Sequence, residues 1–352
     1  MKRRTGFALL APALAALLLV GACSSGGGST AAGGSGGDGK KAVIGDILFD
    51  TDAYQIAQQK QMQKYADSLG IKIIFENQQG QGTKAPDLMQ DLLTRGVNGV
   101  IMQPADASVA VPLVRQAQRQ KVPVLGWAIP FGAGVTAPYV GLEEKTETEA
   151  AGKAAAQYVQ QNFPGQPVKV LIVTIAGVSI CSSVRMGPFE QGVKSVAPDA
   201  KITIVNGAAD RNTAVTVTED ALQRDKGYNI ATGCNSDMAM GALQAFKSAG
   251  LGGATGKKPG HTYFYSINGT DEELRALTDP TSPLMADLGL TPKEVAKTLI
   301  DTILAMISGK ISPYGTYTAN VPDKPLGPDC TAANDFNKSE YLAAASLPCV
   351  GK

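Results

Sequence analysis

Hydrophobic and polar positions along the chain form two successive series of alternating strand and helix patterns. Continuous apolar runs predict strands buried on both faces, and apolar residues spaced three and four apart predict amphipathic helices. The change of period is clearest at 53–69, where Gly70 is expected to end a helix. The first series predicts strands at 43–48, 71–75, 99–102 and 123–127, and helices at 53–69, 87–94 and 109–120.

The second series contains sequence signals for helix starts as well as strands. Thr146 and Thr270 are each followed three residues later by Glu, which predicts capping boxes, and Thr291 before Pro292 predicts another helix start. Repeated βα units imply parallel sheets with helices on both faces. We therefore predict an α/β fold with two doubly wound lobes. The second series predicts strands at 169–174, 201–205, 229–232 and 262–267 and helices at 146–163, 270 onwards and 291–308.

The N-terminal segment has the features of an export signal. Three basic residues precede an apolar stretch at 7–20, which is too short to span a bilayer comfortably. The run VGAC at 20–23 resembles a bacterial lipobox, which implies lipid on Cys23 and cleavage before it. Residues 24–39 form a Gly/Ser/Ala tether. We expect residues 1–22 to be a lipoprotein signal peptide and 23–40 to be the lipidated Cys23 and its tether; the alternative is an ordinary secretory signal.

Composition limits the classes of function that the chain could have. Of its 352 residues, 32 are basic and 31 acidic, which argues against a dedicated nucleic-acid binder. The hydrophobic share of 44% is that of a globular protein. His261 is the only histidine, so a two-histidine metal site is excluded and a Ser/His/Asp arrangement is disfavoured. We expect no enzyme activity, no cofactor and no metal.

Four cysteines follow Cys23, and an even number outside the cytoplasm favours two disulfides. Cys181 and Cys234 closely follow the first and third strands of the second series, which are neighbours in the usual doubly wound order. We expect these two to pair, and Cys330 to pair with Cys349. Free thiols and a Cys181–Cys330 pair remain alternatives, because connectivity cannot be deduced from sequence alone.

Polar and aromatic residues are concentrated after the predicted strands. Ligands of doubly wound folds bind at the carboxyl ends of the strands, so these positions form the candidate site. Hydrogen-bonding groups beside an aromatic face suit a neutral, hydroxyl-rich ligand, although Asp, Asn, Ser and Thr there are also common helix caps. The candidate ligand-binding residues are Asp52, Tyr54, Trp127, Ser183, Arg185, Asp210, Arg211, Asn235, Asn268 and Asp287.

Three segments resemble a known family. They are 91–106 (DLLTRGVNGVIMQPAD), 235–242 (NSDMAMGA) and 266–270 (SINGT). In order and spacing they are similar to motifs of type I periplasmic binding proteins, specifically the ribose-binding-like group related to lac-repressor effector domains. The resemblance extends from about residue 42 to 310.

The resemblance implies two lobes that are joined by a three-segment hinge and close on a ligand. Lobe 1 would comprise 41–141 and 291–315, and lobe 2 would comprise 142–290. Residues 316–352 would form a C-terminal extension that folds on a lobe surface and takes no part in the cleft.

The family's binding positions carry over to some of the candidates. Asp52 and Tyr54 fall where members place an Asn and an aromatic on the sugar, and Asn235 keeps a family Asn. Asn268 replaces an Asp, and either Arg185 or Ser183 corresponds to the binding Arg. The main departure follows Trp127, where pentose binders carry an Asp-Arg pair and this chain has Ala-Ile at 128–129; that departure puts a pentose ligand in doubt.

The resemblance implies an extracytoplasmic solute-binding lipoprotein at the cell membrane, which delivers a sugar or polyol to the permease of an ABC importer. The alternative is a ligand-sensing lipoprotein of the same fold that presents its ligand to a receptor kinase or another signalling partner. A remote alternative is a nicotinamide-dependent enzyme. The run Gly80-x-Gly82-x-x-Ala85, followed by Asp106, formally fits a dinucleotide fingerprint, but it comes after the second strand rather than the first.

Overall fold

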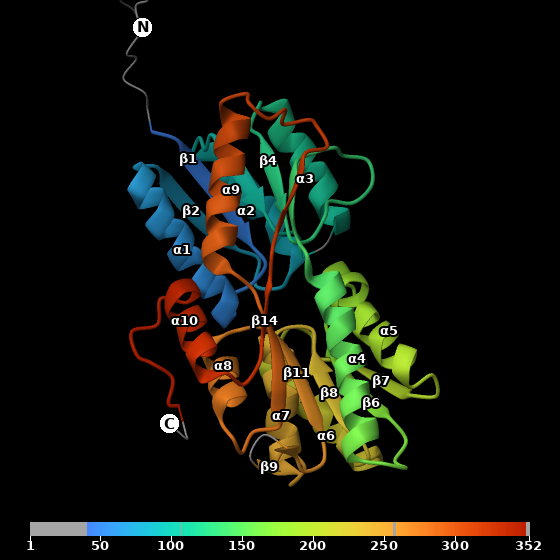
Figure 1. The fold of residues 1–352 in the computed structure, drawn as a ribbon. Helices are drawn as coiled ribbons and strands as arrows, with labels where there is room; N and C mark the ends of the chain where they lie inside the picture. The colour runs from blue at the N-terminus through green and yellow to red at the C-terminus, as the bar shows by residue number, and fades with distance from the viewer. Residues whose placement is uncertain (1–40, 106, 256–257, 350–352) are drawn as a thin grey trace, which may run out of the picture. The chain divides into compact units, whose positions relative to one another are not determined.

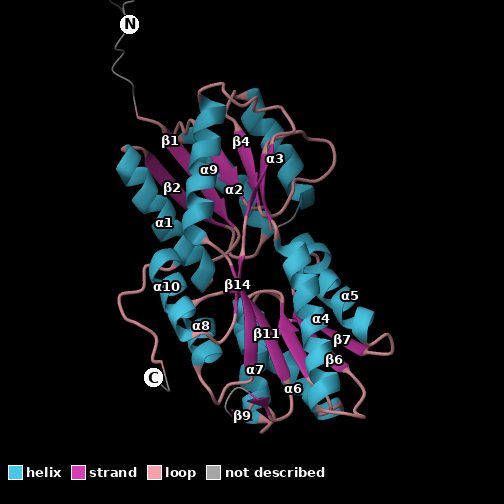
Figure 2. Cartoon of the chain, viewed as in Figure 1, coloured by secondary structure: helices cyan, strands magenta, loops and turns pink. Residues whose placement is uncertain are grey.

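The computed structural model describes residues 41–105, 107–255 and 258–349. The expected signal peptide (1–22), Cys23 and the tether through residue 40 lie outside the described residues. The structure contains two six-stranded sheets, each flanked by helices (Figures 1 and 2). We refer to the sheets and their helices as lobe 1 and lobe 2.

Lobe 1 is built on a sheet with the strand order β13-β5-β4-β3-β1-β2, in which every pair is parallel. Helix α1 packs beside α9, and α2 packs beside α3. The elements are β1 (Val43–Leu48), α1 (Ala53–Leu69), β2 (Lys72–Asn77), a 3₁₀ turn (Gly82–Lys84), α2 (Ala85–Thr94), β3 (Gly99–Met102), α3 (Ala107–Arg119), β4 (Val124–Trp127), β5 (Tyr139–Leu142), α9 (Pro292–Ile307) and β13 (Thr318–Val321).

Lobe 2 has the order β14-β12-β11-β8-β6-β7, parallel except that β14 runs antiparallel to β12. Helix α4 packs on α5, and α6 packs on α7. The elements are α4 (Glu144–Asn162), β6 (Lys169–Thr174), a π-helical segment (Ile180–Met186), α5 (Gly187–Val196), β7 (Lys201–Asn206), α6 (Arg211–Arg224), β8 (Ile230–Gly233), α7 (Ser236–Ser248), β9 (Ala254–Thr255), β10 (Lys258–Pro259), β11 (Tyr263–Asn268), α8 (Asp271–Thr278), β12 (Leu284–Gly289), β14 (Lys324–Leu326) and α10 (Cys330–Glu340).

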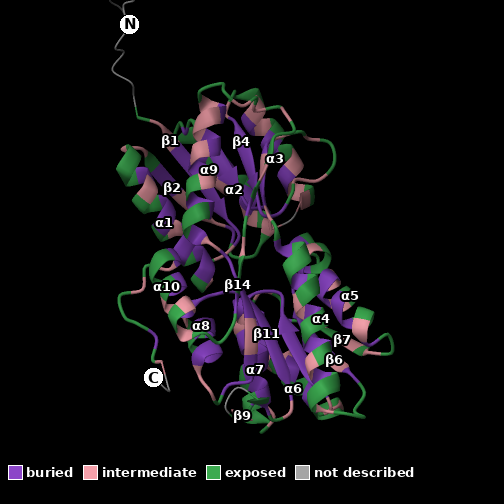
Figure 3. Ribbon diagram, viewed as in Figure 1, coloured by how far each residue is buried: buried purple, intermediate pink, exposed green. Residues whose placement is uncertain are grey.

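The chain passes between the two lobes three times. The first crossing follows β5, the second lies between β12 and α9, and the third lies between β13 and β14, at residues 322–323. The predicted fold class, two doubly wound lobes with three connecting segments, is therefore confirmed. The central strands β3, β4, β8 and β11 are buried along their whole length, which explains their continuous apolar runs (Figure 3).

The structure differs from the expectation in the C-terminal region. Residues 316–352 are not a separate extension, because β13 joins the sheet of lobe 1 and β14 joins the sheet of lobe 2. Both are short edge strands, and β14 contains Pro325, which an edge position tolerates. Such strands bury few side chains, so they leave little hydrophobic pattern in the sequence.

Two further differences concern single residues. The strand β12 was not expected, because Asp287 interrupts its apolar run, yet this aspartate is buried. Thr146 does not begin a helix: α4 starts at Glu144, and Glu143 stands at its N-cap without a side-chain cap. By contrast, the capping box predicted at Thr270 is present, with Glu273 as its partner.

Candidate functional site

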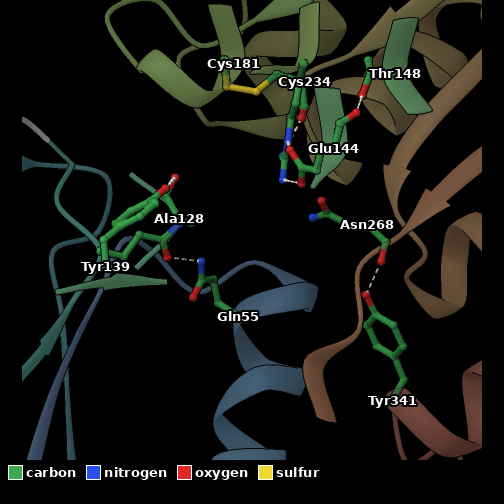
Figure 4. Close-up of polar contacts among 11 residues, drawn as sticks. Gln55, Ala128, Tyr139, Glu144, Thr148, Cys181, Cys234, Asn268 and Tyr341 are labelled. Carbon is green, nitrogen blue, oxygen red and sulfur yellow. Dashed lines mark hydrogen bonds and ion pairs between the residues drawn. A yellow bond between two sulfur atoms is a disulfide. The ribbon is translucent and has the colours of Figure 1, made fainter. Parts of the chain in front are cut away.

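A pocket with an empty volume of about 480 Å³ lies at the carboxyl ends of the strands and receives side chains from both lobes (Figure 4). Six of the predicted ligand-binding residues line this pocket: Asp52, Tyr54, Trp127, Arg185, Asn235 and Asn268. The other lining residues are Phe49, Gln55, Gln103, Ala128, Ile129, Leu142, Ile175, Val178, Ile180, Cys181, Cys234 and Leu290. Strand ends from the two parallel sheets therefore meet at one site.

The lobe-1 side of the pocket contains a polar cluster. We call it the lobe-1 wall and define it as Asp52, Tyr54, Gln55, Gln103 and Trp127; the apolar residues Phe49, Ala128, Ile129 and Leu142 line the pocket beside it. Asp52 is the N-cap of α1, and its carboxylate accepts a hydrogen bond of 2.7 Å from the backbone N–H of Gln55. The amide Nε2 of Gln55 donates to Oε1 of Gln103 at 2.8 Å, which fixes the orientation of the Gln55 amide. Helix α1 and strands β1, β3 and β4 thus hold these side chains together.

Four buried polar atoms of the pocket residues have no hydrogen-bond partner among the described residues. Three belong to the lobe-1 wall: the Tyr54 hydroxyl, Gln55 Oε1 and Trp127 Nε1. The fourth is Asn268 Oδ1, on lobe 2. An unpaired buried polar group is costly, so such atoms are satisfied when a ligand supplies the missing partner. Together they offer donors and acceptors to a ligand with several hydroxyl groups.

The environment of Asp52 favours its neutral form. Burial raises the pKa of Asp52 to about 8, and the neighbouring Asp50 acts in the same direction. The pKa of Asp50 is itself raised to about 6, mainly by burial. At neutral pH, Asp52 therefore adds little negative charge to the pocket and can exchange hydrogen bonds as a carboxylic acid.

Arg185 lines the pocket, and three of the five N–H groups of its guanidinium donate to protein atoms. Its Nε and Nη2 atoms each donate to the Glu144 carboxylate at 2.6 Å, and its Nη1 donates to the Cys234 carbonyl at 2.8 Å. Both side chains are buried. Burial lowers the pKa of Arg185, but Glu144 offsets this effect and leaves the pKa above its ordinary value. The charged Arg185 side chain thus links the π-helical segment to Glu144, at the first crossing, and to Cys234, directly after β8.

The lobe-2 side of the pocket contains an apolar patch. We call this patch the lobe-2 wall and define it as Ile175, Val178, Ile180, Cys181 and Cys234; the polar residues Arg185, Asn235 and Asn268 line the pocket beside it. Cys181 and Cys234 form a disulfide with a Cα–Cα distance of 5.3 Å, between the ends of the neighbouring strands β6 and β8. The expected Cys330–Cys349 disulfide is also present, with a Cα–Cα distance of 5.7 Å. The first disulfide therefore forms part of the pocket surface.

Asn268 connects the pocket to the C-terminal region. Its φ angle is 132°, a conformation that residues with side chains rarely adopt. The Tyr341 hydroxyl donates a 2.5 Å hydrogen bond to the Asn268 carbonyl (Figure 4). A backbone that is strained in this way persists when its surroundings hold it in place. None of the described residues from 316 to 349 lines the pocket, but the Tyr341 contact connects the C-terminal region with Asn268, which does.

The same region contacts both lobes. The Gln61 amide on α1 donates to the carbonyls of Ser339 and Glu340, at 3.0 and 2.7 Å. The Glu340 carboxylate accepts from the backbone N–H of Lys293 at the start of α9. On lobe 2, the Asn337 amide donates to Asp271 of α8 at 2.8 Å. Helix α10 and the residues after it therefore lie between the helices of the two lobes.

Four predicted residues lie outside the pocket lining. Ser183, in the π-helical segment, is exposed and does not line the pocket. Asp210 caps α6 through the Thr213 backbone, so its carboxylate points at the helix end, and Arg211 forms an ion pair with Glu272. Asp287 is buried in β12, accepts a short hydrogen bond from the Ser266 hydroxyl, and has a pKa that burial raises to about 7.

Sequence reasoning missed several lining residues. Gln55 directly follows Tyr54, a predicted binding residue, and Gln103 directly follows the predicted strand at 99–102. Both could therefore have been predicted from their positions in the sequence. Ile175, Val178 and Ile180 gave no such signal, because isolated apolar residues in a loop cannot be distinguished from core residues by sequence. Whether these three residues line the pocket depends on how the loop after β6 packs.

The structure also bears on metal binding, on the dinucleotide fingerprint and on membrane-spanning helices. Within the described residues, no group of His, Cys, Asp and Glu could hold a metal ion. Asp106 of the dinucleotide fingerprint lies outside the described residues. In the part of the chain that the structure describes, no helix is both long and apolar enough to cross a membrane.

Comparisons with known proteins place the chain in a family. The sequence profile described as "Periplasmic binding protein domain" matches residues 47–311. The chain is 28% identical over 204 residues to the ribose import binding protein of Bacillus subtilis, a match that covers 55% of this chain and 62% of that protein. The profile and the relative are both described as binding proteins and not as enzymes, in agreement with the expectation that the chain is not an enzyme.

Solved structures show the same fold. The myo-inositol binding protein of Caulobacter, solved with myo-inositol, has a TM-score of 0.71 at 22% identity, covering 86% of this chain and 98% of that one. A Mycobacterium smegmatis protein in complex with β-D-fucofuranose has a TM-score of 0.72 at 16% identity, covering 87% of this chain and all of that one. With two such lobes around one pocket and a profile match over most of its length, the chain belongs to the periplasmic binding protein family.

Proposed function

We propose that this chain is an extracytoplasmic solute-binding lipoprotein, which captures a sugar or polyol between its two lobes and delivers it to the permease of an ABC importer. The observation that carries the proposal is the set of four unpartnered polar atoms around one pocket, on Tyr54, Gln55, Trp127 and Asn268. Hydroxyl groups both donate and accept hydrogen bonds, so a polyol can satisfy all four atoms.

The charges of the pocket support a neutral ligand. Arg185 is engaged by Glu144, and the raised pKa of Asp52 favours its uncharged form. The relatives agree with this chemistry: the named or bound ligands of the compared proteins are ribose, myo-inositol and β-D-fucofuranose. The aromatic residues Phe49 and Trp127 offer apolar surfaces for the C–H groups of a sugar ring.

Binding is tested directly by thermal unfolding of the purified mature chain with a panel of sugars and polyols. A true ligand should stabilise the protein by about 4 kcal/mol at a thousandfold excess over its Kd. The double variant Tyr54→Phe/Trp127→Phe removes two of the unpartnered groups and should reduce this stabilisation, whereas Tyr314→Phe changes an exposed tyrosine and should not. A panel without any stabilising sugar or polyol would refute the proposal.

Anchoring and delivery need separate tests. The lipobox predicts that Cys23→Ala releases the chain from the membrane fraction, while the unsubstituted chain stays there. Uptake of the radiolabelled ligand by cells that lack the chain separates transport from sensing. Loss of uptake, restored by the chain, supports delivery to a permease; normal uptake with a lost transcriptional response supports the sensing alternative.

A further inference from the structure

The two walls of the pocket differ in chemistry. On the lobe-2 wall, Ile175, Val178 and Ile180 are 8%, 8% and 7% exposed, and the disulfide between Cys181 and Cys234 continues the same surface. The side chains of this wall carry no group that forms strong hydrogen bonds. A ligand surface that lies against them loses water without gaining a hydrogen bond.

Among the described residues of lobe 2 that line the pocket, Arg185 is the charged one, and its charge is balanced within the protein. Arg185 donates from three of its nitrogens to Glu144 and to the Cys234 carbonyl. The serines of the adjacent π-helical segment, Ser182 and Ser183, are exposed. Hydroxyl groups of the ligand therefore find their partners on the lobe-1 wall and at the polar residues Arg185, Asn235 and Asn268, all of which lie outside the lobe-2 wall as defined.

We infer that the ligand is a neutral sugar or polyol with a deoxy or methyl-substituted edge, and that this apolar edge lies against the lobe-2 wall. The inference rests on the proposed function and narrows its ligand class. An added hydroxyl on that edge is buried without a partner, whereas a methyl group fills the same space favourably. Discrimination of this kind in an apolar pocket amounts to roughly 10- to 100-fold in affinity.

Calorimetric titration with matched ligand pairs tests the inference. Suitable pairs are D-fucose with D-galactose, L-rhamnose with L-mannose, and a mono-O-methyl inositol with myo-inositol. In at least one pair, the deoxy or methylated member should bind roughly 10- to 100-fold more tightly. If both members of every pair that binds have equal affinity, or the fully hydroxylated member binds more tightly, the inference fails and the proposed function stands. If none of these ligands binds and the wider panel is also negative, both fail.

A pair of isosteric variants tests whether the lobe-2 wall causes the preference for the deoxy or methylated ligand. Val178→Thr adds one hydroxyl to the lobe-2 wall at nearly constant volume and should reduce the affinity ratio of the discriminating pair several-fold. Val205→Thr, on the edge strand β7 and outside the pocket, is the matched control and should leave the ratio unchanged. Because the ratio compares two ligands on one protein, a general loss of stability does not imitate the effect. An unchanged ratio in a folded Val178→Thr protein would overturn the assignment of the apolar edge to this wall.

Discussion

The two lobes use the ends of similar parallel sheets to build unlike walls. The lobe-1 wall presents polar groups at the ends of β1, β3 and β4. The lobe-2 wall presents the apolar loop after β6 and a disulfide, and the charge of the neighbouring Arg185 is balanced by Glu144. The comparison teaches that a shared fold places a site at the strand ends, while loop conformation and internal partners decide its chemistry.

The largest expected effect concerns the buried ion pair of Arg185 with Glu144 on lobe 2. Glu144→Ala leaves Arg185 buried and unpaired, which should lower the free energy of unfolding by about 3–5 kcal/mol. Glu147→Ala, at an exposed position of the same helix, is the control. Urea denaturation measures both variants. A loss below about 1 kcal/mol for Glu144→Ala would mean that water reaches Arg185, and the lobe-2 wall would then not be apolar.

The protonation of Asp52 tests the neutrality of the lobe-1 wall. Its pKa in the folded protein is raised to about 8 by burial and by Asp50, with a smaller contribution in the same direction from Asp237, whereas the hydrogen bond from the Gln55 backbone and the charge of Arg185 lower it. The folded state thus retains a proton that the unfolded state loses near pH 4. This stabilisation is complete below pH 4 and is lost as the pH rises to about 8, at up to about 1.4 kcal/mol per pH unit.

Asp52→Asn keeps a helix-capping side chain but cannot titrate, so the stability of the variant should fall less steeply between pH 5 and 8. Asp220→Asn, at an exposed position, should keep the original slope. Chemical denaturation at several pH values provides the comparison. Equal slopes for Asp52→Asn and the unsubstituted protein would show that Asp52 is ionised in the folded state.

Trp127 tests the hydrogen-bonding role of the lobe-1 wall. Trp127→Phe keeps an aromatic ring but removes the Nε1 donor, so affinity should fall about five- to tenfold, equivalent to about 1 kcal/mol. As Trp127 is the only tryptophan, ligand addition should also change the intrinsic fluorescence of the unsubstituted protein. Unchanged affinity and fluorescence would reduce Trp127 to a core residue.

The smallest expected effect comes from a contact behind the pocket. Tyr341→Phe removes the hydrogen bond to the Asn268 carbonyl and should weaken binding by about 0.5–1 kcal/mol, mainly through faster ligand release. Tyr317→Phe, at an exposed position near β13, is the control. Surface plasmon resonance separates the rates. If Tyr341→Phe and the control bind alike, Asn268 holds its conformation without the C-terminal region.

The sequence by itself determined the repeated βα order, most strand positions and the caps of α1 and α8. These features depend on residues a few positions apart, so the periodicity of apolar residues and the N-cap side chains record them locally. Because parallel strands end at a common edge, the sequence also predicted that Asp52, Trp127 and Asn235 would lie at one site.

Only the tertiary structure decided which of the strand-end residues line the pocket. Asp210 was expected in the pocket but is used as a helix cap, and Arg185 is held by Glu144, which lies 41 positions away in the sequence. The contact between Tyr341 and Asn268 spans 73 positions. Such pairings depend on how loops and edge strands pack after the chain has crossed between the lobes three times. Local hydrophobic pattern carries no information on contacts at that sequence distance, because the free energy that selects them arises when separate elements bury surface against one another.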